Sequence, residues 1–264
     1  MRIKIKYLLI FFLSIFSFAC KKVIDVKLKN ADVQTVITGE VNNMPGPYKV
    51  TISKSASFTA DNNFPPVSGA TVIISGNGIT DTLLEKEAGS YFTQKLEGKP
   101  GETYTLKVSI DGKTYSAEST MPKPVRLDSL SFLLGNRNNI YPVANFKDPS
   151  GIHNYYQFTE FVNGKRFGNG RGVTLFDDRL SDGRYISRTL YDDSSDIKPG
   201  VVLKVEMKCI DEHVFNYLNE LLQISGYGGG FSSPAPDNPE SNISGGVLGY
   251  FSANTVSSKT VEIE

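Results

Sequence analysis

The chain has 264 residues, with 28 basic and 28 acidic side chains and therefore no formal net charge. This balance argues against a dedicated nucleic-acid surface, which normally carries a clear basic excess. The length allows one large domain or two ordinary domains with hydrophobic cores.

The N-terminal segment has the pattern of a bacterial export signal. Basic residues at positions 2, 4 and 6 precede an apolar run over 7–18, which ends shortly before Cys20. A membrane-spanning helix needs about 20 apolar residues, and this run is shorter. We therefore predict a signal peptide over 1–19, lipidation of Cys20, and a tether over 20–32.

The alternative at this end is ordinary secretion, which would leave Cys20 as a free thiol. Ser17 stands where a lipobox more often has Leu. A lipoprotein carries more than one acyl chain, and two or more chains anchor stably. We expect a protein attached to a membrane, outside the cytoplasm.

Residues 33–121 are predicted to form an immunoglobulin-like β-sandwich. Short alternating runs recur there between turn signals, at the strand count of that fold. The seven expected strands are 33–41, 48–53, 70–75, 80–85, 90–96, 103–110 and 113–120. Asp111-Gly112 suits the positive φ angles of a type I′ turn, so the last two strands should form a hairpin.

The prolines at 122 and 124 favour a stiff extended segment, and 122–125 is the predicted linker between domains. Residues 126–264 are expected to form a second β-rich domain, either a sandwich or a partly open barrel, with a hairpin at Asn163-Gly164. One α-helix is predicted near 212–224, with Asp211 as its N-cap. Its apolar residues at 214, 218, 221 and 222 should face a sheet or plug an end of the sandwich.

Candidate contact residues are aromatic. A Gly- and Pro-rich stretch follows the helix, and loops of that length are often functional; Tyr227 and Phe231 lie in it and are the predicted ligand contacts. The aromatic residues at 155, 156, 158 and 161 occupy both faces of one strand, so some are core and some could be exposed.

Groups suited to catalysis are few. His153 and His213 are the only imidazoles, and His213 should be a surface residue. Cys209 alternates with apolar residues along a strand face, which predicts a buried thiol. Once Cys20 is lipidated, no intramolecular disulfide can form.

Acidic residues crowd two turns, one at positions 177, 178 and 182 and the other at 192, 193 and 196. Carboxylates in flexible loops suit Ca²⁺, but the neighbouring arginines allow charge-paired solvated turns instead. A hydrolase would need the two turns to converge in one cleft. We assign no metal and no cofactor from the sequence.

Several segments together resemble a known family of lipoproteins from Bacteroidota. They are Cys20-Lys21-Lys22-Val23-Ile24-Asp25-Val26, Pro45-Gly46-Pro47-Tyr48, Pro66-Val67-Ser68-Gly69-Ala70, Asn242-Ile243-Ser244-Gly245-Gly246 and Gly249-Tyr250-Phe251. The family is domain of unknown function 4249. The resemblance implies an outer-membrane lipoprotein, often encoded beside TonB-dependent receptors, and brings no activity or catalytic residue. Lys21 and Lys22 replace the acidic cluster that favours surface display, so the periplasmic and surface faces both stay open.

The function expected from these features is that of a non-enzymatic accessory lipoprotein, which binds a ligand or a neighbouring TonB-dependent receptor. An adhesin or structural spacer is the alternative, and a hydrolase is a third reading. Because fold alone does not give function, the expectation rests on association.

Overall fold

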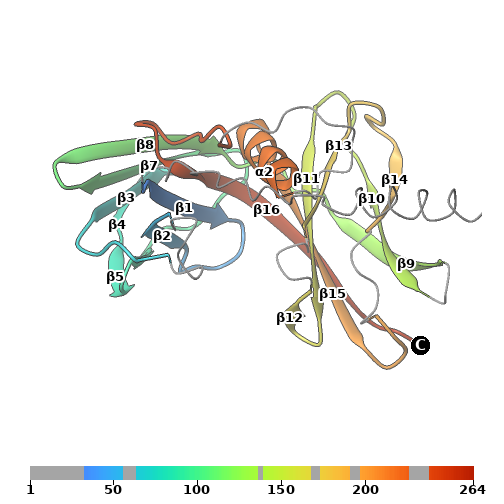
Figure 1. Cartoon of the computed structure of the whole chain (residues 1–264). Coiled ribbons are helices and arrows are strands. Elements are labelled where there is room, and N and C mark those ends of the chain that lie inside the picture. Colours follow the sequence, from blue (N-terminus) through green and yellow to red (C-terminus); the bar gives the residue numbers. More distant parts are fainter. Residues whose placement is uncertain (1–32, 56–63, 136–138, 168–172, 191–196, 226–237) are drawn as a thin grey trace, which may run out of the picture. The chain divides into compact units, whose positions relative to one another are not determined.

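The computed structural model describes residues 33–55, 64–135, 139–167, 173–190, 197–225 and 238–264. These residues form β-strands and a single helix, α2, over Glu212–Ile224 (Figure 1). The predicted all-β class is confirmed. The predicted signal peptide, Cys20 and the tether lie outside the described residues.

Two sheets packed face to face form the first sandwich. In the described part of this region, one sheet runs β4-β3-β7-β8, and β2, β6 and β5 extend from β1 in the other. The strands are β1 (Thr35–Asn42), β2 (Lys49–Lys54), β3 (Thr71–Gly76), β4 (Ile79–Thr82), β5 (Leu84–Glu87), β6 (Ser90–Phe92), β7 (Thr103–Ile110) and β8 (Lys113–Thr120). The immunoglobulin-like sandwich predicted for this region is confirmed.

One expected strand proved to be two. Residues 80–85 were predicted as a continuous strand, but β4 pairs with β3 while β5 pairs with β6 in the opposite sheet. Leu83 lies between them and is buried in the core, where its N–H donates to the carbonyl of Val72 at 2.9 Å. The chain therefore crosses between sheets at Leu83, a step that alternation in the sequence does not reveal.

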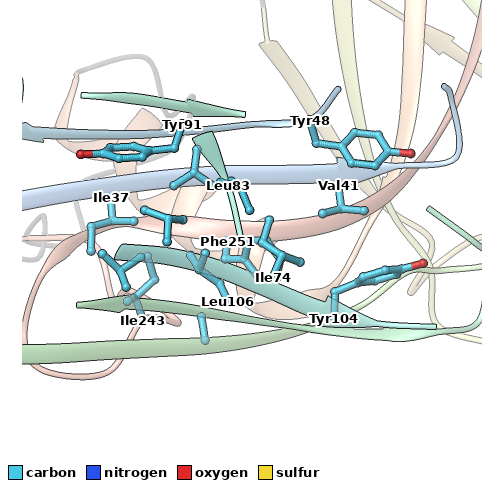
Figure 2. Packing of buried hydrophobic residues seen from close by; sticks show 14 of the residues in the cluster. Ile37, Val41, Tyr48, Ile74, Leu83, Tyr91, Tyr104, Leu106, Ile243 and Phe251 are labelled. Atoms are coloured by element: carbon cyan, nitrogen blue, oxygen red, sulfur yellow. The ribbon is translucent and has the colours of Figure 1, made fainter. Parts of the chain in front are cut away.

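Two tyrosines close one end of the first core. Figure 2 shows the rings of Tyr48, which directly precedes β2, and of Tyr104 in β7 at the same end of the cluster. Their hydroxyls accept hydrogen bonds from the N–H groups of Gly98 (2.8 Å) and Lys99 (2.7 Å). These hydrogen bonds hold the 97–99 connection over this end of the sandwich. They also give the backbone N–H groups a partner, whereas unpaired buried N–H groups would lower the stability of the fold.

The C-terminal strand β16 (Leu248–Glu262) belongs to both halves of the structure. Its first residues run parallel to β1, and its later residues run antiparallel to β15 (Val202–Ile210) (Figure 1). Phe251 is fully buried in the first core and pairs in register with Gly39, where an added Cβ would lie 3.1 Å from the Phe251 ring. The first core is thus completed by residues far along the chain, which the sequence analysis did not foresee.

The first and last residues of the Gly249-Tyr250-Phe251 motif have distinct roles. Gly249 has φ +98°, and a Cβ there would lie 1.9 Å from the carbonyl oxygen of Ile37, so only glycine allows this approach to β1. Asn242 holds Phe251 from the other side: its side chain accepts from the Phe251 N–H (3.0 Å) and donates to the Phe251 carbonyl (2.8 Å).

A second core lies between the sheet β14-β10-β9 and the β11–β15–β16 part of the large sheet. Because two separate sheets enclose it, this described region is a sandwich. Phe146 is its centre, with ring centroids 4.8 Å from Tyr156 and 5.9 Å from Phe158. The strands are β9 (Leu127–Leu134), β10 (Ile140–Lys147), β11 (Tyr155–Val162), β12 (Lys165–Arg166), β13 (Val173–Asp177), β14 (Tyr185–Thr189) and β15 (Val202–Ile210). The predicted linker at 122–125 stays a prediction.

Local signals in the sequence correspond closely to the structure. Positive φ angles occur at Asp111 and Gly112 and again at Asn163 and Gly164, where the two predicted hairpins turn. The helix has the predicted bounds and the predicted N-cap, since the Asp211 carboxylate accepts from the N–H of Val214 at 2.9 Å.

Candidate functional site

A groove of about 650 Å³ lies between α2 and the face of the large sheet that points away from both cores. Side chains alternate along a strand, so residues next to the core residues of β1, β11 and β15 form its floor. The lining residues are Glu40, Gln157, Thr159, Phe161, Arg166, Val173, Glu206, Lys208, Leu218, Leu221, Leu222, Ser225 and Tyr250. Its volume and its mixture of apolar and polar groups are typical of ligand-binding clefts.

Helix α2 forms one wall of the groove because its first half is fixed. The Asp211 carboxylate caps the helix and also accepts a hydrogen bond from the Ser119 hydroxyl at the end of β8. Val214, Tyr217 and Leu218 are buried against the sheet. The helix start is therefore held to both the first sandwich and the sheet beneath it.

The second half of the helix differs from the prediction. Leu221 was expected to pack on a sheet, but 41 % of it is exposed and it lines the groove together with Leu222. Tyr217, which the sequence analysis did not include in the apolar face, takes the buried position instead. The aromatic side chain reaches the sheet, where its hydroxyl accepts from the N–H of Gly249 at 3.1 Å.

Four charged residues line the groove, two of them acidic (Glu40, Glu206) and two basic (Arg166, Lys208), and each carboxylate is paired with a lysine. Lys208 hydrogen-bonds to Glu40, whose carboxylate also accepts from the Asn254 side-chain amide at 2.8 Å. Glu206 pairs with Lys204 at 2.6 Å. The floor therefore presents polar groups without a strong charge of either sign.

Tyr250 marks the boundary between the groove and the apolar base of the helix. Its ring centroid lies 5.2 Å from that of Tyr217. Burial raises the pKa of Tyr250 to about 12, and the nearby Glu40 carboxylate adds to the shift. The phenol therefore stays protonated near neutral pH and can act as a hydrogen-bond donor toward the groove.

The aromatic residues of β11 divide between core and groove, as alternation predicts. Tyr156 and Phe158 lie in the second core. Tyr155 packs beside Phe215 of α2, with ring centroids 5.0 Å apart, and Phe161 lines the groove. The structure thus assigns one of the four predicted aromatics to the groove.

The predicted thiol and imidazole positions are as follows. Cys209 is buried, as expected, and burial raises the pKa of its thiol. His213 is exposed on α2. His153 is also exposed, and its Nε2 lies 3.6 Å from Asp178 Oδ1. None of these three residues is among those that line the groove.

The three acidic residues of the 177–182 turn differ in their partners. Asp177 pairs with Arg179 at 3.0 Å; burial opposes ionisation of Asp177, but the hydrogen bonds from Arg179 outweigh it and lower the pKa. Asp178 and Asp182 instead lie beside Asp148, at the end of β10. Asp148 was missed because it is distant in sequence and stands alone there.

Several predicted residues fall outside the described part of the chain. They are Cys20, Tyr227 and Phe231, and the acidic residues at 192, 193 and 196. Convergence of the two acidic turns therefore stays untested. In the part that the structure describes, no helix has the length and apolar character needed to cross a membrane.

Comparisons with known proteins give a family and no activity. No curated protein matches the chain. Among solved structures, a two-fibronectin type-III domain segment from chicken tenascin aligns with 67 % of this chain and 91 % of its own, at 12 % identity and a TM-score of 0.21, which supports no argument about this chain. The family described as "Domain of unknown function (DUF4249)" matches residues 21–260. The chain belongs to that family.

Proposed function

We propose that this chain is a lipid-anchored outer-membrane lipoprotein without enzymatic activity. It binds a ligand or a neighbouring TonB-dependent receptor through the groove beneath α2. The groove itself carries the proposal: about 650 Å³ of space, lined on the helix side by leucines and on the sheet side by both polar and aromatic groups.

The chemistry of the groove supports binding more than catalysis. Its described lining contains no histidine or cysteine, and its two carboxylates are hydrogen-bonded to Lys208 and Lys204. Each of these carboxylates already accepts a hydrogen bond from a lysine, so a substrate would have to displace that partner before the carboxylate could act as a general base. Leu221, Phe161 and Tyr250 offer apolar and aromatic surface of the kind that contacts peptides and saccharides.

The anchor is supported by the export pattern that ends at Cys20. Lipidation predicts that the full-length protein fractionates with outer membranes, and that a Cys20→Ala form is released to the soluble phase. Recovery of both forms in the membrane fraction would contradict the anchor.

The binding proposal is tested by affinity purification of the tagged, lipidated protein from native outer membranes. Leu221→Arg is the variant, because this residue is 41 % exposed and can be replaced without opening a core. A receptor recovered in stoichiometric amount with the wild type and lost with Leu221→Arg would support the groove. Equal recovery with both would overturn it. Recovery of no receptor with the anchored wild type would favour an adhesin or spacer.

A further inference from the structure

Three carboxylates from two separate turns meet beside the second core. Asp148 follows β10, whereas Asp178 and Asp182 belong to the turn between β13 and β14. One oxygen of each lies within 4.8 Å of the others. Asp148 is fully buried and Asp178 is 1 % exposed, while Asp182 faces solvent.

Asp148 and Asp182 are held by donors from their own surroundings. Asp148 accepts from the Tyr156 hydroxyl at 2.5 Å and from the N–H of Gly183 at 2.8 Å. Asp182 accepts from the N–H of Gly151 at 2.9 Å. These bonds orient the carboxylates but bring no positive charge to them.

Asp178 has a buried oxygen that accepts no hydrogen bond. Its Oδ2 accepts from the N–H of Asn154 at 3.0 Å and from the Asn154 side-chain amide at 3.3 Å. Its Oδ1 is buried without a hydrogen-bond partner, and the nearest cationic group given by the structure is the exposed ring of His153 at 3.6 Å. An imidazole carries charge only when protonated. A buried carboxylate oxygen without a hydrogen-bond partner is destabilising, and a bound cation would supply the missing partner.

The arrangement is unfavourable for three free carboxylates. Like charges at this distance repel, and burial weakens the screening by water. The ammonium of the adjacent Lys147 donates to the carbonyl of Gly183 at 2.6 Å, so this hydrogen bond does not pair it with any of the three carboxylates.

We propose that Asp148, Asp178 and Asp182 bind a divalent cation, Ca²⁺ in preference to Mg²⁺, which ties the β10–β11 turn to the β13–β14 turn. Two oxygens on opposite sides of a Ca²⁺ ion lie about 4.6–5.2 Å apart, so three oxygens within 4.8 Å of one another can share one ion. The exposed side at Asp182 admits the water molecules that complete six to eight ligands. Mg²⁺ demands near-octahedral geometry, which carboxylates oriented by other donors do not readily give.

The proposal is independent of the groove and is tested on the full-length protein, stripped of metal with a chelator. Tb³⁺ replaces Ca²⁺ in oxygen sites, and its luminescence is excited through a nearby tyrosine. The chain has no tryptophan, and Tyr156 bonds directly to Asp148. We expect Tb³⁺ luminescence that Ca²⁺ displaces more effectively than Mg²⁺. Ca²⁺ at a hundredfold excess over its Kd should raise the melting temperature by roughly 5–10 °C.

Two variants distinguish a specific cation site from the general attraction of cations to acidic residues. Asp182→Asn removes the negative charge of one ligand at an exposed position and should weaken Ca²⁺ binding roughly tenfold or more. Asp177→Asn, in the same turn but paired with Arg179, is the matched control and should keep the wild-type response. The proposal is overturned if the stripped wild type shows no saturable response to Ca²⁺, or if Asp182→Asn and Asp177→Asn respond as the wild type does.

Discussion

Replacing Phe251 by alanine should destabilise the whole described structure, because β16 serves both cores. Phe251 is fully buried in the first core, and its ring occupies the space that Gly39 leaves free. Truncating a buried phenylalanine to alanine lowers the free energy of unfolding by about 3–5 kcal/mol when the neighbouring side chains cannot collapse into the cavity. For a chain of this size, that loss lowers the melting temperature by roughly 6–20 °C.

The assay is urea unfolding followed by circular dichroism and tyrosine fluorescence, with hydrogen exchange to locate the effect. Faster exchange should reach β15 as well as β1, since β16 pairs with both. Phe64→Ala is the matched control, because Phe64 is 56 % exposed and its loss should change stability by less than about 0.5 kcal/mol. A loss below about 1 kcal/mol for Phe251→Ala, or one without any effect on β15, would refute the shared role of β16.

Three further changes test individual interactions. The N–H groups of Gly69 and Gly89 lower the pKa of Glu85 to about 2. The ionised Glu85 therefore stabilises the fold above the ordinary glutamate pKa, and this contribution is lost as the pH falls toward 2. The difference in the free energy of unfolding between wild type and Glu85→Gln should be wide at pH 7 and narrow at pH 2. Asp81 is buried and accepts from three backbone N–H groups, so Asp81→Ala should lower the free energy of unfolding by about 2–4 kcal/mol. Asp211→Ala removes the N-cap and should lower it by about 0.5–2 kcal/mol, while Asp211→Asn keeps an acceptor and should lower it less.

Denaturant unfolding at matched pH measures all three effects. A stability gap for Glu85→Gln that does not change with pH would contradict the role of the two glycine N–H groups. An unchanged midpoint for Asp81→Ala would mean that water satisfies the freed donors. Equal losses for Asp211→Ala and Asp211→Asn would show that the cap itself contributes little.

Elements set by neighbouring residues could be predicted from the sequence. The turn residues Asp111-Gly112 and Asn163-Gly164 adopt positive φ with little strain, which locates both hairpins. The N-cap Asp211 and the apolar spacing after it locate the helix to the residue. In each case the signal and the structure lie within a few positions of one another.

Pairings between distant segments could not be predicted. Alternation indicates a strand but not its partner, so nothing in the sequence showed that β16 would lie parallel to β1. The groove depends on that pairing, because Glu40 and Lys208 become neighbours only when β1, β16 and β15 share a sheet. Asp148 joined the acidic cluster for the same reason: the turns after β10 and β13 are brought together by the second sandwich.

The claim that the groove beneath α2 is the binding site is tested most directly by site-specific photo-crosslinking in native membranes. A photo-reactive residue replaces Leu221, which is exposed in the groove, and in a second strain it replaces Leu180, which is 93 % exposed and does not line the groove. A discrete covalent adduct from position 221 and none from position 180 is the predicted result. No adduct from position 221, or the same adducts from both positions, would contradict the claim.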